Sequence, residues 1–287
     1  MRIFLNNKFV AERKAVVSVF DHGFLYGDGV FETLRAYHGR IFRLDEHLKR
    51  LKASAQGLEI SLPYTLPVLR QHLKKILVVN DLNNALLRIC ISRGCGPIGL
   101  DPAHCQKPTI VIIPRVFNSY GERQYHKGLK IAIVSVRRTP RPVLDPRIKS
   151  ANFLNNILAK IQAKRARADE GLMLATNGYL TEGSISNFFI VTCGSLYTPR
   201  VDLGILAGIT RRLVIDLAKQ ADIPVNETCL RPSDLYKADE CFLTNTSMEI
   251  MPVTKADGFT IGDGKPGPVT RFLRKAYQER VSVECRS

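Results

Sequence analysis

Near the middle of this chain of 287 residues lies the segment Arg147-Ile148-Lys149-Ser150-Ala151-Asn152-Phe153-Leu154-Asn155-Asn156. Apolar residues recur at helical spacing behind the lysine, namely Phe153, Leu154, Ile157, Leu158 and Ile161. This pattern predicts that Lys149 sits at a strand-to-helix junction and that the apolar stripe is partly buried. A helix N-terminus and burial both favour the neutral form of a lysine amine, which is the form that Schiff-base chemistry requires. The alternative is a solvated surface lysine, and the other segments must decide between the two.

The composition is that of an ordinary globular protein, with 45% hydrophobic and 24% charged residues. No apolar run approaches the roughly 18 residues of a membrane span, and the N-terminus turns polar too soon for a signal peptide. We therefore expect a cytoplasmic protein with no membrane partner. The seven cysteines form no Cys-x-x-Cys pair and have no histidine at zinc-ligand spacing, which predicts reduced thiols and no metal site.

The net charge of +16 raises nucleic acid as a possible partner. However, the basic residues are spread along the chain, no nucleic-acid-binding motif is present, and there is no Trp for base stacking. The densest basic run, which comprises Lys160, Lys164, Arg165 and Arg167, fits the solvated face of the helix that follows Lys149. We therefore expect small anionic ligands such as phosphates and carboxylates, and no nucleic acid.

The first part of the chain predicts a small α+β domain over residues 1–115. Two hairpins are expected in residues 1–42, separated by the glycine-rich segment 21–32, which is interpreted as a loop or turn. An amphipathic helix is expected from Leu44 and a second helix over residues 65–79. Two strands follow, over residues 86–92 and 109–115. Residues 116–128 show neither a helix nor a strand period and are interpreted as an interdomain linker.

Residues 129–287 predict a larger domain of mixed α/β character. The segment opens with a strand over residues 130–136, passes a loop rich in proline and arginine, and reaches Lys149 and its helix. Strands are expected at residues 171–176, 179–183, 187–191 and 241–243. Further helices are expected to begin near Gly208 and at Gly267-Pro268.

If Lys149 carries pyridoxal phosphate, three further parts are required: a phosphate cradle, a carboxylate for the pyridine nitrogen, and donors for a substrate carboxylate. Ala207-Gly208-Ile209-Thr210 opens a helix, whose N–H groups suit a phosphate. Thr244-Asn245-Thr246 ends a strand with hydroxyl groups, and Arg50 can add a charge-assisted contact. Glu182 follows a hairpin turn as a carboxylate that is placed to be buried, and a pyridinium would be a suitable partner. Taken one by one, these residues also fit a capped helix start, a surface arginine and an edge-strand charge.

Together the motifs resemble the class IV, or fold type IV, pyridoxal-phosphate aminotransferases over nearly the whole chain and in the expected order. This family contains branched-chain aminotransferases, D-amino-acid aminotransferases and aminodeoxychorismate lyases. The matching segments are Tyr26-Gly27-Asp28-Gly29-Val30-Phe31-Glu32, His47-Leu48-Lys49-Arg50-Leu51, Ile148-Lys149-Ser150, Thr181-Glu182-Gly183 with Asn187-Phe188, Gly208-Ile209-Thr210-Arg211, and Glu249-Ile250-Met251-Pro252-Val253.

The resemblance implies a role for each matched residue. Lys149 is the Schiff-base lysine and the proton shuttle, and Glu182 pairs with the pyridine nitrogen. The phosphate is held by Arg50, by the backbone of Ile209 and Thr210, and by Thr246. The substrate side is assigned to Tyr26, Phe31, Arg88 and Ser247. The resemblance also implies a small α+β domain, a larger domain with a barrel-like sheet and flanking helices, a cofactor between them, and a homodimer or larger homo-oligomer.

Three activities within the family remain open. Ser92-Arg93-Gly94 and Leu144-Asp145-Pro146-Arg147 favour a branched-chain L-amino-acid aminotransferase of amino-acid biosynthesis that uses 2-oxoglutarate in a ping-pong cycle. Leu86 departs from this pattern, because branched-chain enzymes have a tyrosine there for the substrate carboxylate. Thr33 and the Thr244–Ser247 loop lean towards D-amino-acid aminotransferases, yet Ile98 stands where those enzymes place an arginine. Segments shared with 4-amino-4-deoxychorismate lyases keep that activity as a further alternative.

Overall fold

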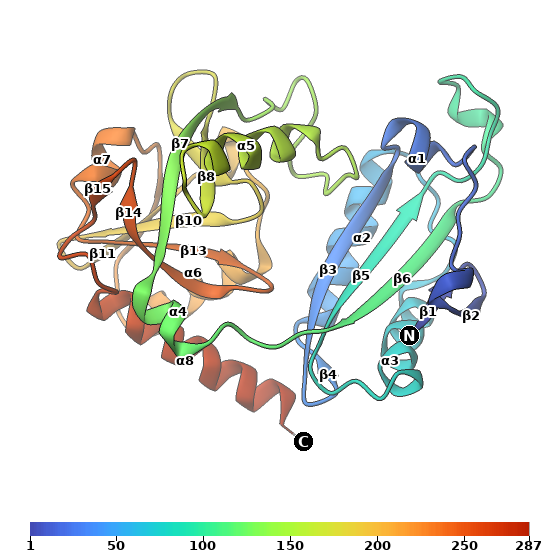
Figure 1. The fold of residues 1–287 in the computed structure, drawn as a ribbon, viewed down its shortest axis with the longest axis horizontal. Coiled ribbons are helices and arrows are strands. Elements are labelled where there is room, and N and C mark those ends of the chain that lie inside the picture. Colours follow the sequence, from blue (N-terminus) through green and yellow to red (C-terminus); the bar gives the residue numbers. More distant parts are fainter. Residues whose placement is uncertain (287) are drawn as a thin grey trace. The chain divides into compact units, whose positions relative to one another are not determined.

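The computed structural model describes residues 1–286, and the chain divides into two compact units (Figure 1). The first unit comprises Met1–Asn118, Ile148–Phe153 and the C-terminal residues from Val281. The second comprises Ser119–Arg147 and Leu154–Arg280. The segment around Lys149 thus differs from the sequence prediction, which gave it to the larger C-terminal part. The reason is backbone pairing: Phe31 N donates to Lys149 O at 3.0 Å and Ala151 N to Gly29 O at 2.7 Å.

The first unit is built on an antiparallel six-stranded sheet with the order β2-β1-β6-β5-β3-β4. Its strands are β1 (Arg2–Leu5), β2 (Lys8–Ala11), β3 (Gly29–Tyr37), β4 (Arg40–Ile41), β5 (Ala85–Ser92) and β6 (Thr109–Val116). Its helices are α1 (His22–Tyr26), α2 (Leu44–Gly57) and α3 (Leu66–Val79), with short 3-10 turns at η1 (Glu12–Lys14) and η2 (Pro102–His104).

Alternation along β3 and β5 places one side of this sheet in a hydrophobic core with α2 and α3. Val30 and Leu34 of β3 lie in the same buried cluster as Leu51 of α2 and Leu73 of α3. The predicted hairpins, helices and strands of this part are confirmed to within a residue or two. The interpretation of residues 21–32 as a loop alone is wrong, since they contain α1. Asp21 caps this helix by accepting from Gly23 N at 2.8 Å, and Gly27 ends it in the left-handed region.

The second unit contains a nine-stranded mixed sheet with the path β12-β11-β10-β13-β14-β7-β8-β9, to which β15 adds at β14. Strand β9 ends this path, yet it also packs against β10 and β11, so the sheet curls towards a half-barrel. The strands are β7 (Leu129–Arg137), β8 (Glu170–Leu174), β9 (Leu180–Gly183), β10 (Asn187–Thr192), β11 (Ser195–Pro199), β12 (Val225–Thr228), β13 (Glu240–Asn245), β14 (Glu249–Ala256) and β15 (Phe259–Thr260). The helices are α4 (Glu122–Lys127), α5 (Leu154–Arg165), α6 (Ile209–Gln220), α7 (Pro232–Tyr236) and α8 (Pro268–Cys285), with the 3-10 turn η3 (Val201–Leu203). Helix α8 begins in the second unit, and its residues from Val281 belong to the first.

The segment predicted to be a linker contains the short helix α4. Gln124 accepts from Gly121 N through its side chain at 3.1 Å, which supports the first turn. Tyr125 is buried and donates its hydroxyl to Met248 O at 3.2 Å. This anchor ties α4 to the second unit although the sequence of the segment shows no clear helical period.

Helix α5 faces the opposite way from the predicted one. Its buried residues are Asn156, Ala159 and Ala163, whereas Leu154, Ile157, Leu158 and Ile161 are exposed. The small side chains lie against β7 and β8, where a Cβ added to Gly171 would stand only 2.8 Å from Ala159 O. The close approach of helix and strand leaves no room for large side chains, so the aliphatic stripe points outward.

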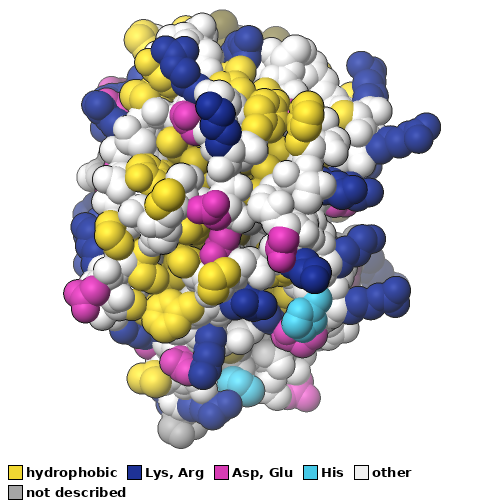
Figure 2. All heavy atoms as spheres, turned by 90° about the vertical axis from the view of Figure 1, so that its left-hand side faces the viewer, with side chains coloured by type: hydrophobic (Ala, Val, Ile, Leu, Met, Phe, Trp, Pro, Cys, Tyr) yellow, Lys and Arg dark blue, Asp and Glu magenta, His cyan; other side chains and the backbone are white. Residues whose placement is uncertain are grey.

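Basic side chains are dispersed over the face of the molecule drawn in Figure 2, where they alternate with acidic and hydrophobic ones. Within the described part of the chain, no helix combines the length and the apolar character that a membrane span needs. Residues 1–286 likewise hold no group of three or more His, Cys, Asp or Glu side chains that could bind a metal ion.

Candidate active site

Lys149 lies beside the N-terminal end of β3 in the first unit. Its backbone N donates to Ser54 Oγ of α2 at 3.0 Å, and Ser150 forms a β-bridge with Val30. The segment is therefore an added extended piece along β3, and α5 begins only at Leu154. The lysine therefore lies five residues before the first residue of α5, and not directly at the start of a helix as the sequence pattern predicted.

The Lys149 side chain reaches an aromatic cluster. Its Nζ lies 4.6 Å from the ring centroid of Phe31 and 6.0 Å from that of Phe153. The guanidinium carbon of Arg88 lies 3.8 Å from the centroid of the same Phe31 ring. Phe31 is buried and Arg88 is exposed. The structure thus brings three of the predicted residues together: the amine, the apolar ring and a guanidinium that suits a carboxylate.

Arg50 belongs to a buried charge cluster on the helix-facing side of β3. Its Nε and one terminal nitrogen donate to the two oxygens of Glu32 at 2.6 and 2.8 Å, and His47 Nδ1 lies 2.8 Å from Glu32 Oε2. Burial alone would raise the pKa of Glu32, but the charges and hydrogen bonds of Arg50 and His47 outweigh it and lower the pKa to about 2. Burial also lowers the pKa of His47, against the opposing effect of Glu32. Glu32 is therefore an anion at neutral pH, and it orients the Arg50 guanidinium.

Tyr26 stands at the end of α1. Its hydroxyl accepts from Gly99 N at 3.0 Å, and its ring meets His22 edge-on. The next residue, Gly27, lies against the backbone of Asn152, three residues beyond Lys149, where an added Cβ would be 3.5 Å from Asn152 Cα. Tyr26 is thus held by the 93–108 loop, next to the segment that carries Lys149.

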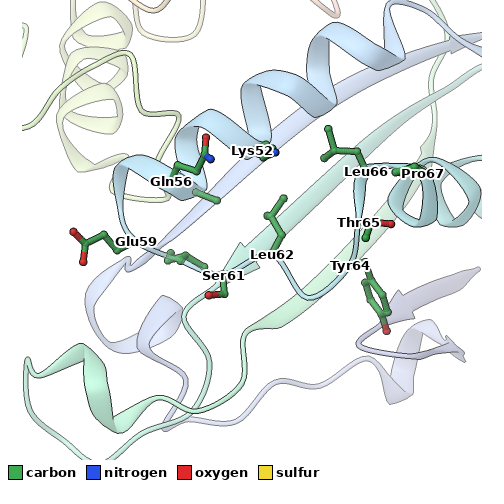
Figure 3. Close-up of a pocket in the computed structure, with 11 residues that line it drawn as sticks. Lys52, Gln56, Glu59, Ser61, Leu62, Tyr64, Thr65, Leu66 and Pro67 are labelled. Atoms are coloured by element: carbon green, nitrogen blue, oxygen red, sulfur yellow. The ribbon is translucent and has the colours of Figure 1, made fainter.

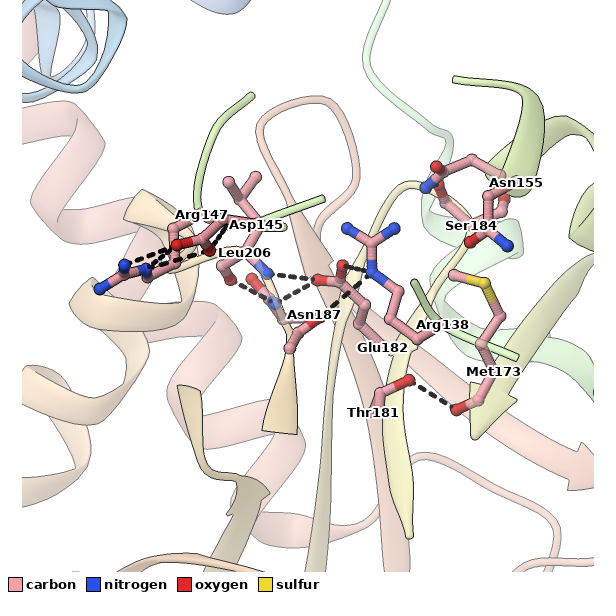
Figure 4. Close-up of polar contacts among 12 residues, drawn as sticks. Arg138, Asp145, Arg147, Asn155, Met173, Thr181, Glu182, Ser184, Asn187 and Leu206 are labelled. Carbon is pink, nitrogen blue, oxygen red and sulfur yellow. Dashed lines mark hydrogen bonds and ion pairs between the residues drawn. The ribbon is translucent and has the colours of Figure 1, made fainter. Parts of the chain in front are cut away.

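In the second unit, Glu182 is buried at the end of β9 with only 5% of its surface exposed, and several donors surround it. Oε1 faces Arg138 Nε at 2.9 Å, while Oε2 accepts from Asn187 Nδ2 at 3.1 Å and from Leu206 N at 3.0 Å (Figure 4). Burial of this carboxylate was predicted and is confirmed. Its pairing with an arginine of the chain was not predicted.

Helix α6 begins where its sequence predicted. Gly208 is its N-cap and offers no side-chain cap, so the N–H groups of Ile209 and Thr210 point out of the first turn without an intrahelical acceptor. Thr246 and Ser247 lie in the turn after β13, where Asn245 Oδ1 accepts from Ser247 N at 2.9 Å and from Met248 N at 2.7 Å. The two features are neighbours, because α6 packs on β13, and Thr244 of β13 pairs with Asn187 of β10.

A cavity of about 840 Å³ in the first unit lies away from these residues. Lys52, Ala55 and Gln56 line it from α2, together with residues 59–62 and 64–67 (Figure 3). At about 100° per residue, Lys52 and Gln56 project from the opposite face of α2 from His47, Arg50 and Ser54. The residues of the sequence motifs therefore do not gather at this cavity.

Comparison with known proteins identifies the family. Residues 29–256 match the family described as "Amino-transferase class IV". This chain is a class IV aminotransferase. The class IV aminotransferase is 47% identical over 280 residues to a putative branched-chain-amino-acid aminotransferase of Methanocaldococcus jannaschii, covering 97% of this chain and 96% of the relative. It is also 36% identical over 298 residues to a D-alanine aminotransferase of Listeria monocytogenes, covering 99% and 98% of the two chains.

Solved structures agree with the sequence comparison. A branched-chain amino acid aminotransferase from T.th., crystallised with pyridoxamine 5'-phosphate, superposes with a TM-score of 0.95 at 35% identity and covers 98% of this chain and 94% of its own. The predicted family and the predicted α+β fold of type IV are therefore confirmed.

The residues of this class IV aminotransferase fit the cofactor of its structural neighbour. An amine, a buried carboxylate and a helix N-terminus without a side-chain cap are the groups that an aldehyde, a pyridine nitrogen and a phosphate would need. In addition, the Thr244 hydroxyl at the end of β13 is buried without a hydrogen-bond partner among the described residues.

Proposed function

We propose that this class IV aminotransferase uses pyridoxal 5'-phosphate to move an amino group between a branched-chain L-amino acid and 2-oxoglutarate. The observation that carries the proposal is the Phe31 ring, which Lys149 Nζ approaches at 4.6 Å and the Arg88 guanidinium carbon at 3.8 Å. An amine and a guanidinium that contact one apolar ring suit an amino acid with a carboxylate and an aliphatic side chain. The 47% identity to a putative branched-chain-amino-acid aminotransferase supports the same substrate class.

The chain's residues divide the work as follows. Lys149 is the residue that would bond to the cofactor, and the substrate amine would displace it. The freed Nζ would then accept the proton from the substrate Cα. Arg50, the N–H groups of Ile209 and Thr210, and Thr246 hold the phosphate. Glu182 holds the pyridine nitrogen. When bound, pyridoxal phosphate supplies the electron sink for the carbanion at the substrate Cα.

Substrate recognition is assigned to the residues around Phe31. Phe31 offers the apolar surface, Arg88 a charge for a substrate carboxylate, and Tyr26 and Ser247 hydroxyl groups. The same site must accept an amino acid and, in the second half-reaction, an oxo acid, so kinetics with varied substrates should be of the ping-pong type.

We also propose a homodimer. The stripe of Leu154, Ile157, Leu158 and Ile161 on α5 is exposed in the single chain, with 40 to 62% of each residue accessible. A continuous aliphatic stripe of this kind is typical of an interface between subunits.

A second candidate is a D-amino-acid aminotransferase, which the 36% identity to a D-alanine aminotransferase favours. An absorbance experiment separates the two. The purified protein is mixed in turn with L-leucine, L-glutamate and D-alanine, and the visible band of the lysine-bound cofactor is followed. We expect L-leucine and L-glutamate to remove the band and D-alanine to leave it unchanged. Loss of the band with D-alanine alone would replace the branched-chain proposal with the D-specific one.

A further inference from the structure

Glu182 is held to one particular segment of the second unit, residues 204–208, which leads into α6. Arg138 Nε lies 2.9 Å from Glu182 Oε1 in an ion pair and donates its hydrogen bond to Gly204 O at 3.2 Å, so one nitrogen contacts both groups. Asn187 Nδ2 donates to Glu182 Oε2 at 3.1 Å and to Leu206 O at 2.9 Å. Leu206 N closes the set by donating to Glu182 Oε2 at 3.0 Å.

The same segment is packed tightly against Asn187. A Cβ added to Gly208, the N-cap of α6, would stand 2.0 Å from Asn187 Oδ1. Gly208 has a φ of −67°, so its backbone does not require glycine, and the close approach of the amide does. The Asn187 side chain therefore reaches from the Glu182 carboxylate to the N-cap of the helix.

Arg138 also compensates the charge of the carboxylate. Glu182 has 6% of its side chain exposed and Arg138 has 11%, and a buried carboxylate without a partner would be costly. In Figure 4 the two terminal nitrogens of Arg138 point away from Glu182, and the contact is made through Nε. Arg138 thus compensates the charge of the Glu182 carboxylate and contacts it from one side only, through Nε.

We infer that Arg138 and Asn187 are positioning residues that fix the Glu182 carboxylate relative to the start of α6. The inference rests on the proposed function, in which Glu182 holds the pyridine nitrogen and the N–H groups of Ile209 and Thr210 hold the phosphate. The two ends of pyridoxal phosphate are joined by a rigid ring, so a carboxylate and a helix start at a set separation bind it better than two independent groups.

The test uses cofactor-free protein and the variants Arg138→Gln, Arg138→Lys, Asn187→Ala and Gly208→Ala. Arg137→Gln is the matched control, because Arg137 is the exposed neighbour of Arg138. The dissociation constants of pyridoxal phosphate and of inorganic phosphate are measured for each protein, together with thermal unfolding without ligand. Inorganic phosphate probes the proposed phosphate site alone, and pyridoxal phosphate probes that site and Glu182 at once.

We expect Arg138→Gln, Asn187→Ala and Gly208→Ala to weaken pyridoxal phosphate binding about tenfold or more. Arg138→Gln removes the ion pair with Glu182, Asn187→Ala removes a hydrogen bond to the same carboxylate, and Gly208→Ala displaces the Asn187 amide. Inorganic phosphate binding should stay within about twofold of wild type. Arg138→Lys should recover part of the affinity because it restores the charge, and Arg137→Gln should bind as wild type does.

Two results would overturn the inference. One is unchanged pyridoxal phosphate affinity in all four variants. The other is an equal loss of affinity for both ligands with a lower unfolding temperature, which would mean that the helix start itself is damaged. Failure of the proposed function is distinguishable from both, since wild-type protein would then bind no pyridoxal phosphate.

Discussion

The Glu32 carboxylate shows how one residue can organise the surroundings of another. Glu32 is almost completely buried and carries a negative charge that Arg50 and His47 stabilise from α2. Because two nitrogens of Arg50 are bound to Glu32, the direction of the remaining guanidinium nitrogen is fixed. In the proposed function, this fixed direction serves the cofactor phosphate.

Replacing Glu32 with Gln removes one charge of a buried pair and should lower the free energy of unfolding by about 3 kcal/mol at pH 7. The lowered pKa of Glu32 means that its carboxylate stabilises the fold fully above its ordinary pKa of 4.5 and loses this effect as the pH falls towards about 2. The free energies of unfolding of wild type and Glu32→Gln, measured with urea, should therefore differ by a constant amount from about pH 7 to about pH 5.5. At about pH 3.5 this difference should be smaller by about 1.4 kcal/mol.

The control for this prediction is Glu46→Gln, which breaks a partly exposed contact with Arg43. That change should cost less than about 1 kcal/mol at every pH. The difference in the free energy of unfolding between Glu32→Gln and wild type could also stay the same from about pH 7 to about pH 3.5. That result would show that the carboxylate charge does not stabilise this cluster.

At the scale of elements, α5 illustrates how packing overrides a helical pattern. The helix lies on β7 and β8 through Ala159 and Ala163, opposite Gly171 of β8. Small residues on both sides allow the backbones to approach closely, and this approach turns the large aliphatic residues outward. The position of α5, directly after the Lys149 segment, thus depends on the small residues Ala159, Ala163 and Gly171.

Gly171→Ala tests this packing. The added Cβ would lie 2.8 Å from Ala159 O, so α5 or β8 must move, and we expect a loss of about 1 to 3 kcal/mol in the free energy of unfolding. Gly121→Ala is the matched control, because its Cβ would meet nothing within 4 Å. The free energy of unfolding of both variants is measured by urea denaturation. Equal values for Gly171→Ala and Gly121→Ala would show that α5 and β8 do not need the close approach.

The sequence alone predicted much of the fold, for identifiable reasons, and its assignment of the site residues stays a prediction. Helices α2, α3 and α6 have clear apolar periodicity, and the Gly208 helix start carries its own local signal. Partners that come from distant segments have no such signal. Arg138 looks like any other arginine in a chain that is rich in them, and its pairing with Glu182 depends on how β7 and β9 lie in the curled sheet.

Contacts between distant segments also explain the wrongly predicted face of α5 and the hydrogen bonds that the sequence did not predict. The stripe from Leu154 to Ile161 has the period of a buried helix face, and only the contact with Gly171 shows that it points outward. Glu32, His47 and Asn187 lay within the recognised motifs, but their roles follow from hydrogen bonds that connect separate elements. The three-residue spacing of His47 and Arg50 on one helix face was the available signal for that cluster.

At the scale of the whole molecule, the exposed stripe of α5 predicts the oligomeric state. Wild-type protein should sediment as a dimer, and the double change Ile157→Glu and Ile161→Glu should give monomers, because charges on an apolar interface are not compensated. Val78→Glu on α3 is the control, since Val78 is also exposed but lies outside the stripe. The oligomeric state is measured by sedimentation-equilibrium ultracentrifugation. A dimeric double variant or a monomeric wild type would contradict this assignment.

Peptide mapping can show whether Lys149 is the residue that bonds to pyridoxal phosphate. The purified protein is treated with borohydride, which makes the bond between lysine and cofactor permanent, and is then digested and analysed by mass spectrometry. The account predicts that the mass of the reduced cofactor is found on the peptide that contains Lys149, and that Lys149→Ala protein carries no such label. A label on a different lysine, or an unlabelled wild-type protein after incubation with pyridoxal phosphate, would contradict the account.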